Sequence, residues 1–515
     1  MTAVSDTPAP VPDPILSTAL AADLDAADFR SEPLRRLWGD EADDALARGM
    51  REPILRAIAG DQSVLATLGR LLVLGMGQPA DAVAEALPRL GVPGLVALGL
   101  ARVEGDTVVP VALLRPQSFV DAEGIGEWWI ASDLDEVALD GALPADHVLG
   151  VGGASRTLAE IIMPIEVDRA LDLGTGCGIQ ALLVARHAGV VVATDISARA
   201  LAYAELNAQI NGVSNIDFRL GSMFEPVAGE AFDLIVSNPP FVITPRVDGV
   251  PEYEYRDGGL VGDALVEQFL RTAPDFLTRG GAAQLLGNWE SRGGQAALEG
   301  RAGLDRLSSW VPADLDLWVV QREELSPLAY AELWIRDGGT TPRDAAFTPL
   351  LTAWLDDFDA RGVSAVGFGY ILVRRPPEAS ASASAPALRR VERVTQPVSN
   401  VGGALRAGLA AHDALAGGLP TTLVTSADVT EARHLLPGND DPSIIELRQG
   451  GGFARTISVD PALAALVGAC DGELTVMQIA AALADLFEVP FADLWASLEP
   501  RIRQLVIDGF MHAAE

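Results

Sequence analysis

The stretch at 169–188, RALDLGTGCGIQALLVARHA, joins a short apolar run to a helical pattern through a glycine-rich turn. Glycines at 174, 176 and 178 permit backbone conformations that other residues avoid, and they let the chain approach a ligand closely. A second apolar run, VVVAT, follows and ends at Asp195, whose carboxylate can accept hydrogen bonds from both hydroxyls of a ribose. A strand, a tight turn, a helix and a second strand in this order predict a βαβ unit of a parallel sheet.

The alternation of strand and helix signals continues from about 165 to 375, which favours a doubly wound α/β sheet. The whole chain of 515 residues is too long for one hydrophobic core. We therefore expect a disordered tail at 1–14, a helical, winged-helix-like domain at 15–145, the α/β domain at 146–375, a flexible Pro/Ala/Ser linker at 376–390 and a winged-helix-like domain at 391–515.

The two flanking domains are predicted from helical periodicity. Apolar residues recur at three-to-four spacing from Ile15 to about Ala101, and two short strands joined by Glu-Gly-Asp at 104–106 follow. The stretch at 470–513 shows three amphipathic helical segments, and Thr475 is suited to cap the first of them. Both patterns indicate small, mostly helical domains.

The charge of the chain excludes several functions. Asp and Glu number 71 against 37 basic residues, a formal net charge of −34, and every basic residue is Arg. Without Lys, neither a Schiff base nor a Walker-type phosphate site can form. Phosphate contacts supply most non-specific affinity for nucleic acid, so such an acidic chain is expected to bind RNA or DNA poorly.

Cysteine content and terminal composition point to a cytoplasmic protein. Cys177 and Cys470 are too few and too far apart to predict a disulfide framework or a zinc site, and we expect no metal. The N-terminal sequence MTAVSDTPAPVPDP lacks the basic and apolar regions of a signal peptide. No run is long and apolar enough for a membrane span, so we expect no membrane contact.

The sequence FDLIVSNPPFVI at 232–243 ends an apolar strand in a set of hydrogen-bond acceptors. Asn238 offers a side-chain carbonyl, and Pro239 and Pro240 add no competing N–H donors. Phe241 can stack on a planar group. Acceptors that converge on one point suit an N–H₂ group, so this motif favours a nitrogen-bearing substrate.

LDLGTGCG together with NPPF resembles the class I S-adenosylmethionine (SAM)-dependent methyltransferases that carry an NPPY or NPPF motif. The resemblance covers roughly 150–375 and implies a Rossmann-like, seven-stranded class I methyltransferase core with SAM as cofactor. Release-factor glutamine methyltransferases and ribosomal guanine-N2 methyltransferases carry similar motifs, and the motif alone does not choose between them. In these families it marks methylation of a nitrogen.

The resemblance also implies the roles of individual residues. The glycines approach the methionyl and ribose portions of SAM, Asp172 lies near its amino end, and Asp195 holds the ribose diol. Ser222 and Met223 are expected beside the adenine, and Thr157 beside the SAM carboxylate. The expected cofactor-binding residues are Asp172, Gly174, Thr175, Gly176, Gly178, Asp195, Ile196, Ser222, Met223, Asn238 and Thr157. The expected catalytic residues are Asn238, Pro239 and Phe241, and the expected substrate-binding residues are Pro240, Tyr253, Tyr255 and Arg256.

The C-terminal stretch at 471–513 resembles the small winged-helix domains of PqqD type, which recognise ribosomally made and modified peptides (RiPPs). If the likeness holds, this domain binds a peptide, for example by adding a strand to an exposed sheet edge. A packing or dimerisation module fits the same pattern.

Three functions follow from these observations. The first is a SAM-dependent N-methyltransferase acting on a side-chain amide or amine of a protein or peptide, including a ribosomally made peptide natural product. The second is an rRNA guanine-N2 methyltransferase, which the net charge opposes. The third is a non-catalytic SAM-binding or peptide-binding protein, which the intact NPPF motif opposes.

Overall fold

The computed structural model describes residues 7–121, 124–139, 143–251, 253, 256–293, 302–377 and 386–514. They form two compact units. The first contains Met1–Ala159, Glu166–Pro312 and Gln321–Arg375, and the second contains Glu160–Ile165, Ala313–Val320 and Pro376–Glu515. The domains expected at 15–145 and 146–375 thus lie almost entirely in the first unit.

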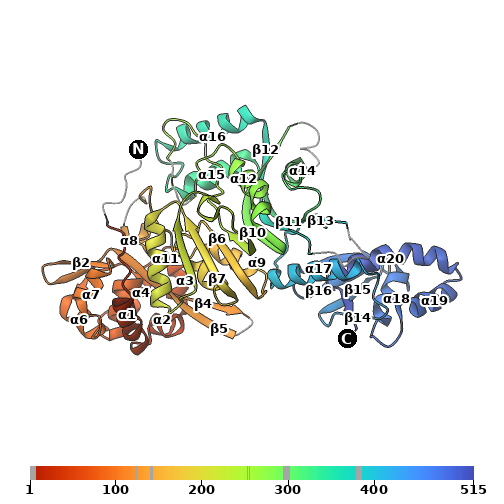
Figure 1. The fold of residues 1–515 in the computed structure, drawn as a ribbon, viewed down its shortest axis with the longest axis horizontal. Helices are drawn as coiled ribbons and strands as arrows, with labels where there is room; N and C mark the ends of the chain where they lie inside the picture. The colour runs from red at the N-terminus through yellow and green to blue at the C-terminus, as the bar shows by residue number, and fades with distance from the viewer. Residues whose placement is uncertain are drawn as a thin grey trace. The chain divides into compact units, whose positions relative to one another are not determined.

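The first unit contains most of a mostly parallel eight-stranded sheet, parts of which are visible in Figure 1, in which the strands β11, β12, β10, β9, β6, β7 and β8 follow in that order. Neighbouring strands from β10 to β8 are parallel, and β12 is antiparallel to β10. This order confirms the Rossmann-like α/β core. The strands are β6 (Val167–Leu173), β7 (Ala188–Asp195), β8 (Ile216–Leu220), β9 (Phe232–Ser237), β10 (Leu277–Arg292), β11 (Asp316–Leu325) and β12 (Val363–Arg374).

The central strands are continuous apolar runs because both faces of the sheet are covered. Leu234, Ile235 and Val236 of β9 are fully buried. At the carboxyl end of the sheet, Leu173 of β6 pairs with Ser237 of β9, and the Ser237 hydroxyl donates a hydrogen bond of 2.7 Å to the Leu173 carbonyl. The ends of β6 and β9 are thereby held together where a ligand is expected.

The helices of this core connect the strands, as a doubly wound sheet requires. They are α9 (Gly153–Ile161), α10 (Ile179–Val184), α11 (Ala198–Ile210), α12 (Ala264–Thr272), α14 (Ala302–Ser309), α15 (Pro327–Asp337) and α16 (Phe347–Arg361). Short 3₁₀ turns lie at Glu225–Val227 and Ala273–Phe276.

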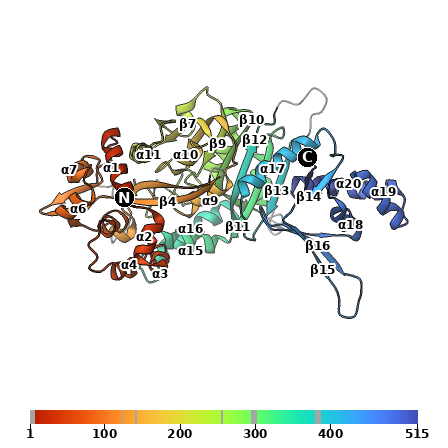
Figure 2. The ribbon, with the colours of Figure 1, turned by 90° about the horizontal axis from the view of Figure 1, so that it is seen from below.

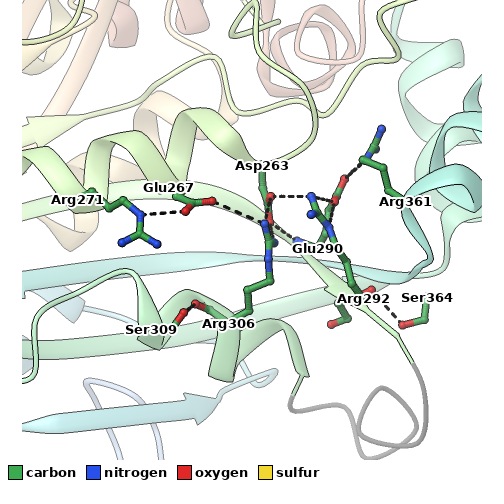
Figure 3. A network of polar contacts seen from close by, with 10 residues as sticks. Asp263, Glu267, Arg271, Glu290, Arg292, Arg306, Ser309, Arg361 and Ser364 are labelled. Carbon is green, nitrogen blue, oxygen red and sulfur yellow. Dashed lines mark hydrogen bonds and ion pairs between the residues drawn. The ribbon is translucent and has the colours of Figure 1, made fainter.

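A buried network of ion pairs fixes several of these helices to β10 (Figure 3). Asp263, just before α12, is fully buried and accepts hydrogen bonds from Arg306 of α14 and from the Glu290 backbone N–H. Glu290 of β10 is also fully buried and is paired with Arg292 and with Arg361 of α16. Each buried carboxylate has guanidinium partners, which buried charges require. The network sets the position of α12, which follows the NPPF segment in the chain.

The N-terminal part of the first unit consists of short helices, a three-stranded sheet of order β1-β3-β2 and a long hairpin. The helical elements are α1 (Pro14–Ala26), α2 (Ser31–Trp38), α3 (Asp40–Leu46), α4 (Glu52–Ala57), α5 (Val64–Leu68), the π-helical turn η1 (Gly69–Val73), α6 (Ala80–Ala86), α7 (Gly91–Ala97) and α8 (Glu136–Leu139). The strands are β1 (Gln78–Pro79), β2 (Ala101–Glu104), β3 (Thr107–Pro110), β4 (Ala112–Asp121) and β5 (Gly124–Asp133).

The expected pair of strands around Glu104 and Asp106 is present as β2 and β3. The extent of the N-terminal tail differs from the prediction. Residues 7–13 of the stretch at 1–14 are described, and the Val11 N–H donates to the Leu98 carbonyl at 3.0 Å. Residues 1–6 lie outside the described residues.

Asn207 of α11 and Asn211, the residue that follows this helix, bind the edge of β5. Asn207 is fully buried; its amide accepts from the Ala131 N–H at 2.7 Å and donates to the Ala131 carbonyl at 2.9 Å. Asn211 makes the same pair of hydrogen bonds with the backbone of Trp129. Asn207 also donates to the Cys177 carbonyl in the glycine-rich turn at 2.8 Å. The side-chain amides thus continue the hydrogen bonding of the hairpin and tie it to the α/β core.

The second unit combines short antiparallel sheets with four helices in its described part. In Figure 2 the hairpin of β15 and β16 extends as a narrow arm. The elements are β13 (Arg389–Arg393), α17 (Val401–Leu415), β14 (Leu423–Thr425), β15 (Val429–His434), β16 (Ile444–Gln449), β17 (Thr456–Val459), α18 (Pro461–Ala469), α19 (Val476–Leu486), α20 (Phe491–Ile507) and β18 (Met511–Ala513). Residues 378–385 of the expected linker lie outside the described residues, and β13 begins within its last two residues.

The structure changes the prediction of three helices at 470–513. Thr475 caps α19 in a reciprocal capping box with Gln478, as the sequence indicated. The remaining two segments are one helix, α20, which continues through Pro500. Proline removes one backbone donor, but the burial of Leu498 and Ile502 on either side of it keeps the helix intact.

Within the described residues, no helix is both long enough and apolar enough to cross a membrane.

Candidate active site

A cavity of about 1320 Å³ opens at the carboxyl edge of the sheet, and it brings together most of the predicted site residues. The predicted residues that line it are Gly174, Thr175, Gly176, Asp195, Ile196, Ser222, Met223, Asn238, Pro239, Pro240, Phe241, Tyr253 and Arg256. Asp172, Gly178 and Thr157 are not among the lining residues. The site therefore lies where open α/β sheets bind ligands.

The glycine-rich turn after β6 needs its glycines for two different reasons. All three have positive φ, at 78° for Gly174, 55° for Gly176 and 86° for Gly178, which other residues rarely adopt. A Cβ on Gly174 or Gly176 would meet nothing within 4 Å, whereas one on Gly178 would lie 2.9 Å from the Ala204 Cβ. The first two glycines thus border open space, and the third lets the turn pack against α11.

Asp172 lies beneath this turn and is 1% exposed. One carboxylate oxygen accepts a 2.6 Å hydrogen bond from the Thr175 hydroxyl, while the other, Oδ1, is buried with no hydrogen-bond partner among the described residues. Burial raises the pKa of Asp172 to about 7, although the Thr175 hydrogen bond opposes the shift. An unpaired buried carboxylate oxygen is costly and would be satisfied by a cationic group.

Asp195, at the end of β7, has both oxygens oriented by backbone donors. The Gly176 N–H donates to Oδ2 and the Ser197 N–H donates to Oδ1, each at 2.9 Å. Burial raises the pKa of Asp195, and these backbone hydrogen bonds oppose the shift. A carboxylate oxygen keeps lone pairs beyond one hydrogen bond, so Asp195 can still accept from a ligand's hydroxyls. Ile196 beside it is 63% exposed on the cavity wall.

The segment after β8 brings Ser222 and Met223 to the same wall. Met223 has a φ of 47°, a left-handed conformation that is uncommon for a non-glycine residue. The preceding Gly221 donates its N–H to the Asp195 carbonyl at 3.0 Å. These two segments are therefore joined next to the cavity.

The NPPF residues follow β9 directly and line the cavity together. Asn238 Oδ1 is buried and has no hydrogen-bond partner among the described residues. The Phe241 ring lies 5.5 Å from the Phe368 ring, measured between centroids, so it is supported from behind by β12. The motif thus contains one hydrogen-bond acceptor, Asn238 Oδ1, that receives no hydrogen bond from the described residues.

The segment after the motif supplies part of the wall on the predicted substrate side. Tyr253 is 6% exposed, and the Arg256 guanidinium lies 4.6 Å from the centre of its ring. Arg256 donates to the Trp334 carbonyl at 3.2 Å and to Asp337 at 3.1 Å. Tyr255 lies outside the described residues. Arg256 is largely buried, so its first role is to hold the wall together.

Thr157 has a different place from that predicted. It lies inside α9, with Gly153 as the first residue of the helix, and so it is neither a cap nor part of the lining. Ser155, two residues earlier, lines the cavity instead, and its carbonyl accepts a 2.6 Å hydrogen bond from Gln180. A buried glutamine in the otherwise apolar run IQALLV is a signal in the sequence for this contact.

Other lining residues were not identified from the sequence, and three of them are polar or aromatic side chains from outside the predicted motifs. His147 is 4% exposed, and burial lowers its pKa although Asp133 lies 4.0 Å from its Nδ1. Trp334 and Asp337 come from α15, about 95 residues after the NPPF motif. No local motif marks them, because only the fold brings α15 to the cavity.

Comparison with known proteins gives two family matches. Residues 149–301 match the methyltransferase small domain, and residues 26–111 match a domain of unknown function, DUF7059. The first match begins before the glycine-rich turn and includes the whole NPPF segment. It ends before α15.

The curated relatives are methyltransferases of glutamine side chains. The chain is 36% identical over 140 residues to the ribosomal protein uL3 glutamine methyltransferase of Bradyrhizobium diazoefficiens, covering 25% of this chain and 44% of that protein. It is 38% identical over 144 residues to the release factor glutamine methyltransferase of Xylella fastidiosa, covering 26% of this chain and 52% of that protein. The chain therefore spans about half the length of these relatives.

A third relative is the putative protein N5-glutamine methyltransferase of Methanocaldococcus jannaschii, 32% identical over 25% of this chain and 66% of that protein. Among solved structures, the chain is similar to a methyltransferase from Pyrococcus furiosus at 16% identity, over 43% of this chain and 81% of that chain, with a TM-score of 0.26. Residues 149–301 of this chain are thus similar to the methyltransferase small domain.

Proposed function

We propose that this protein is a SAM-dependent N-methyltransferase whose substrate is the side-chain amide of a glutamine in another protein. The observation that carries the proposal is the unpartnered, buried Asn238 Oδ1 at the cavity, in a chain related to glutamine methyltransferases. An acceptor in that position lowers the free energy of the protein only when a donor such as an amide N–H₂ reaches it.

The residues in and beneath the cavity suit SAM. Asp172 lies beneath the glycine-rich turn and is not among the lining residues, and its buried Oδ1 has no partner among the described residues, so it would hold the ammonium group of the cofactor directly or through water. Asp195 suits the ribose hydroxyls, and the open space beside Gly174 and Gly176 suits a ligand that approaches the backbone. When bound, SAM would supply an electrophilic methyl group.

The remaining residues bind and orient the substrate. An amide nitrogen is a poor nucleophile because its lone pair is delocalised, so orientation and acceptor hydrogen bonds matter most. Asn238 holds the amide hydrogens, Pro239 and Pro240 contribute no competing N–H donors, and Phe241 covers the planar amide. The proton lost from nitrogen can pass to water, so no general base is needed.

A protein substrate is consistent with the net charge of −34, which favours basic partners over nucleic acid. The relatives are named as glutamine methyltransferases of a ribosomal protein and of release factors. A substrate of that kind would place the activity in the cytoplasm.

The decisive assay supplies the protein with methyl-tritiated SAM and separate protein, peptide and RNA fractions. We expect label in protein, and we expect acid hydrolysis to release it as volatile methylamine, because hydrolysis of an N-methylated glutamine side chain yields glutamate and methylamine. Label in RNA, or protein label that stays non-volatile, would contradict the proposal.

The ionisation of Asp172 predicts how cofactor affinity depends on pH. In the free protein its pKa is about 7, so the carboxyl is mostly protonated below that pH. Binding the ammonium group favours the carboxylate, and a proton must be released on binding at low pH. We expect SAM affinity to fall as pH decreases below 7, by at most about tenfold per pH unit, and to fall again above about pH 8, where an α-amino group loses its proton. Calorimetry between pH 5.5 and 8.5 measures this.

Asp172→Asn provides the control for the pH experiment. It keeps the size of the side chain and an acceptor for Thr175, but it cannot ionise. Its affinity should be weaker at pH 8 and should lose the part of the pH dependence that the carboxyl causes. A variant with the same pH profile as the wild type would show that Asp172 does not bind the cofactor.

We further propose that the second unit binds the substrate protein, in keeping with its PqqD-like pattern, and that ribosomally made peptide natural products are one substrate class. Its support is the three-stranded sheet β15-β16-β17, whose outer strands β15 and β17 offer edges for an added strand. Hydrogen exchange with and without substrate tests this. Slower exchange at β15 or β17 is expected, and unchanged exchange at both would contradict it.

A further inference from the structure

The backbone that follows the NPPF motif is held by partners on both sides. Phe241 forms a β-bridge with Asp257, and the Val242 N–H donates to the Arg256 carbonyl at 3.0 Å. The Thr244 hydroxyl hydrogen-bonds to the Asp257 carboxylate. These contacts lie within 241–257, so they set the shape of the segment but not its position against the rest of the core.

Besides the hydrogen bonds of Arg256 to Trp334 and Asp337, this segment is joined to α15 by Tyr330. The Ile243 N–H donates to the Tyr330 hydroxyl at 3.0 Å, and both residues are at most 3% exposed. The Asn288 side-chain amide of β10 hydrogen-bonds to the same hydroxyl. A single phenol oxygen therefore connects α15, β10 and a residue two positions after Phe241.

The Tyr330 ring is fixed independently of its hydroxyl. It lies 6.0 to 6.1 Å from the rings of Trp334, Trp354 and Phe358, measured between centroids. Burial raises the pKa of Tyr330 well above its usual value, so the phenol stays neutral at any working pH. The hydroxyl is thus a rigid, uncharged acceptor in a fixed place.

We propose that Tyr330 is a positioning residue for methyl transfer, which holds the NPPF segment in register with the cavity through the Ile243 N–H. The proposal rests on the proposed function. Without the hydroxyl, the buried Ile243 N–H has no acceptor, and the segment must move to find one. A shift of this kind moves Phe241 and Asn238, and a misplacement of about 1 Å can cost roughly 100-fold in rate.

The test is Tyr330→Phe, which removes only the oxygen and keeps the packed ring. We expect kcat for methyl transfer to fall by roughly 10- to 100-fold. SAM affinity should stay at the wild-type value, because the substitution changes neither the turn after β6 nor Asp195. Hydrogen exchange of the Ile243 amide, followed by nuclear magnetic resonance, should accelerate in the same variant.

Phe358→Leu is the matched control, because Phe358 belongs to the same aromatic cluster and packs edge-on against Tyr330 without bonding to the segment. It should lower the melting temperature while keeping kcat and the Ile243 exchange rate close to wild type. A Tyr330→Phe variant with wild-type kcat overturns the proposal. A variant whose kcat falls only as much as its folded fraction falls also overturns it.

The amide exchange separates this proposal from the proposed function. If the wild-type protein transfers no methyl group, the proposed function has failed, and the Ile243 exchange rate still reports whether Tyr330 anchors the segment. Unchanged exchange in Tyr330→Phe would overturn the anchor itself.

Discussion

Replacing Asn238 with alanine should abolish most methyl transfer while leaving SAM binding intact. The Asn238 Oδ1 is the buried acceptor assigned to the substrate amide, and it makes no hydrogen bond to the described residues that the variant would break. Removing one preorganised polar group that acts in the transition state typically costs roughly 100- to 1000-fold in kcat. Steady-state kinetics with an unmethylated acceptor protein and calorimetry with SAM measure the two effects separately.

Gln62→Ala is a matched control for this experiment, since Gln62 is an exposed side-chain amide of the first unit that does not line the cavity. It should behave as the wild type in both measurements. If Asn238→Ala retains its turnover, Asn238 does not orient the substrate, and the assignment of the motif to an amide nitrogen is wrong.

Replacing Asp195 with alanine should weaken SAM binding by roughly 100-fold or more. A hydrogen bond to a charged acceptor contributes about 1.5–3 kcal/mol, and each 1.4 kcal/mol is tenfold in affinity. The variant also removes the acceptor of the Gly176 and Ser197 N–H groups, which loosens the turn that faces the ligand. Calorimetry gives the dissociation constant directly.

Ser197→Ala separates the loss of ribose contacts from a local loss of structure. The Ser197 hydroxyl accepts from the Ala200 N–H and caps α11, so its loss should cost about 1 kcal/mol of stability. It removes no acceptor from the ribose. If Ser197→Ala weakens SAM binding as much as Asp195→Ala does, the effect is one of folding, and Asp195 has no special role.

Local sequence patterns led to those candidate residues that are neighbours in the sequence. The glycine-rich turn, the acidic end of β7 and the NPPF sequence each follow a buried strand, and parallel strands bring their carboxyl ends to one edge. The cavity at that edge contains most of the residues named on this basis. Asp172 was also predictable, because it sits on the strand immediately before the turn.

The remainder of the site depends on contacts between distant segments. Trp334, Asp337 and Tyr330 reach the cavity or the NPPF segment only because α15 packs there, and their periodicity is that of any amphipathic helix. Ser155 was missed in favour of Thr157 because a difference of two residues is within the uncertainty of a helix boundary predicted from sequence. The single helix α20 was read as two because proline usually ends a helix.

The amide of Asn207 has a consequence for how this protein can change over evolution. One side chain is bonded to Ala131 of the hairpin and to Cys177 of the glycine-rich turn, so it joins a stretch that lies between the two regions matched by family models to the turn that follows β6. A change in the backbone of the hairpin is therefore expected to shift this turn. Exchanging the hairpin for that of an unrelated protein should disturb the turn even when both parts fold.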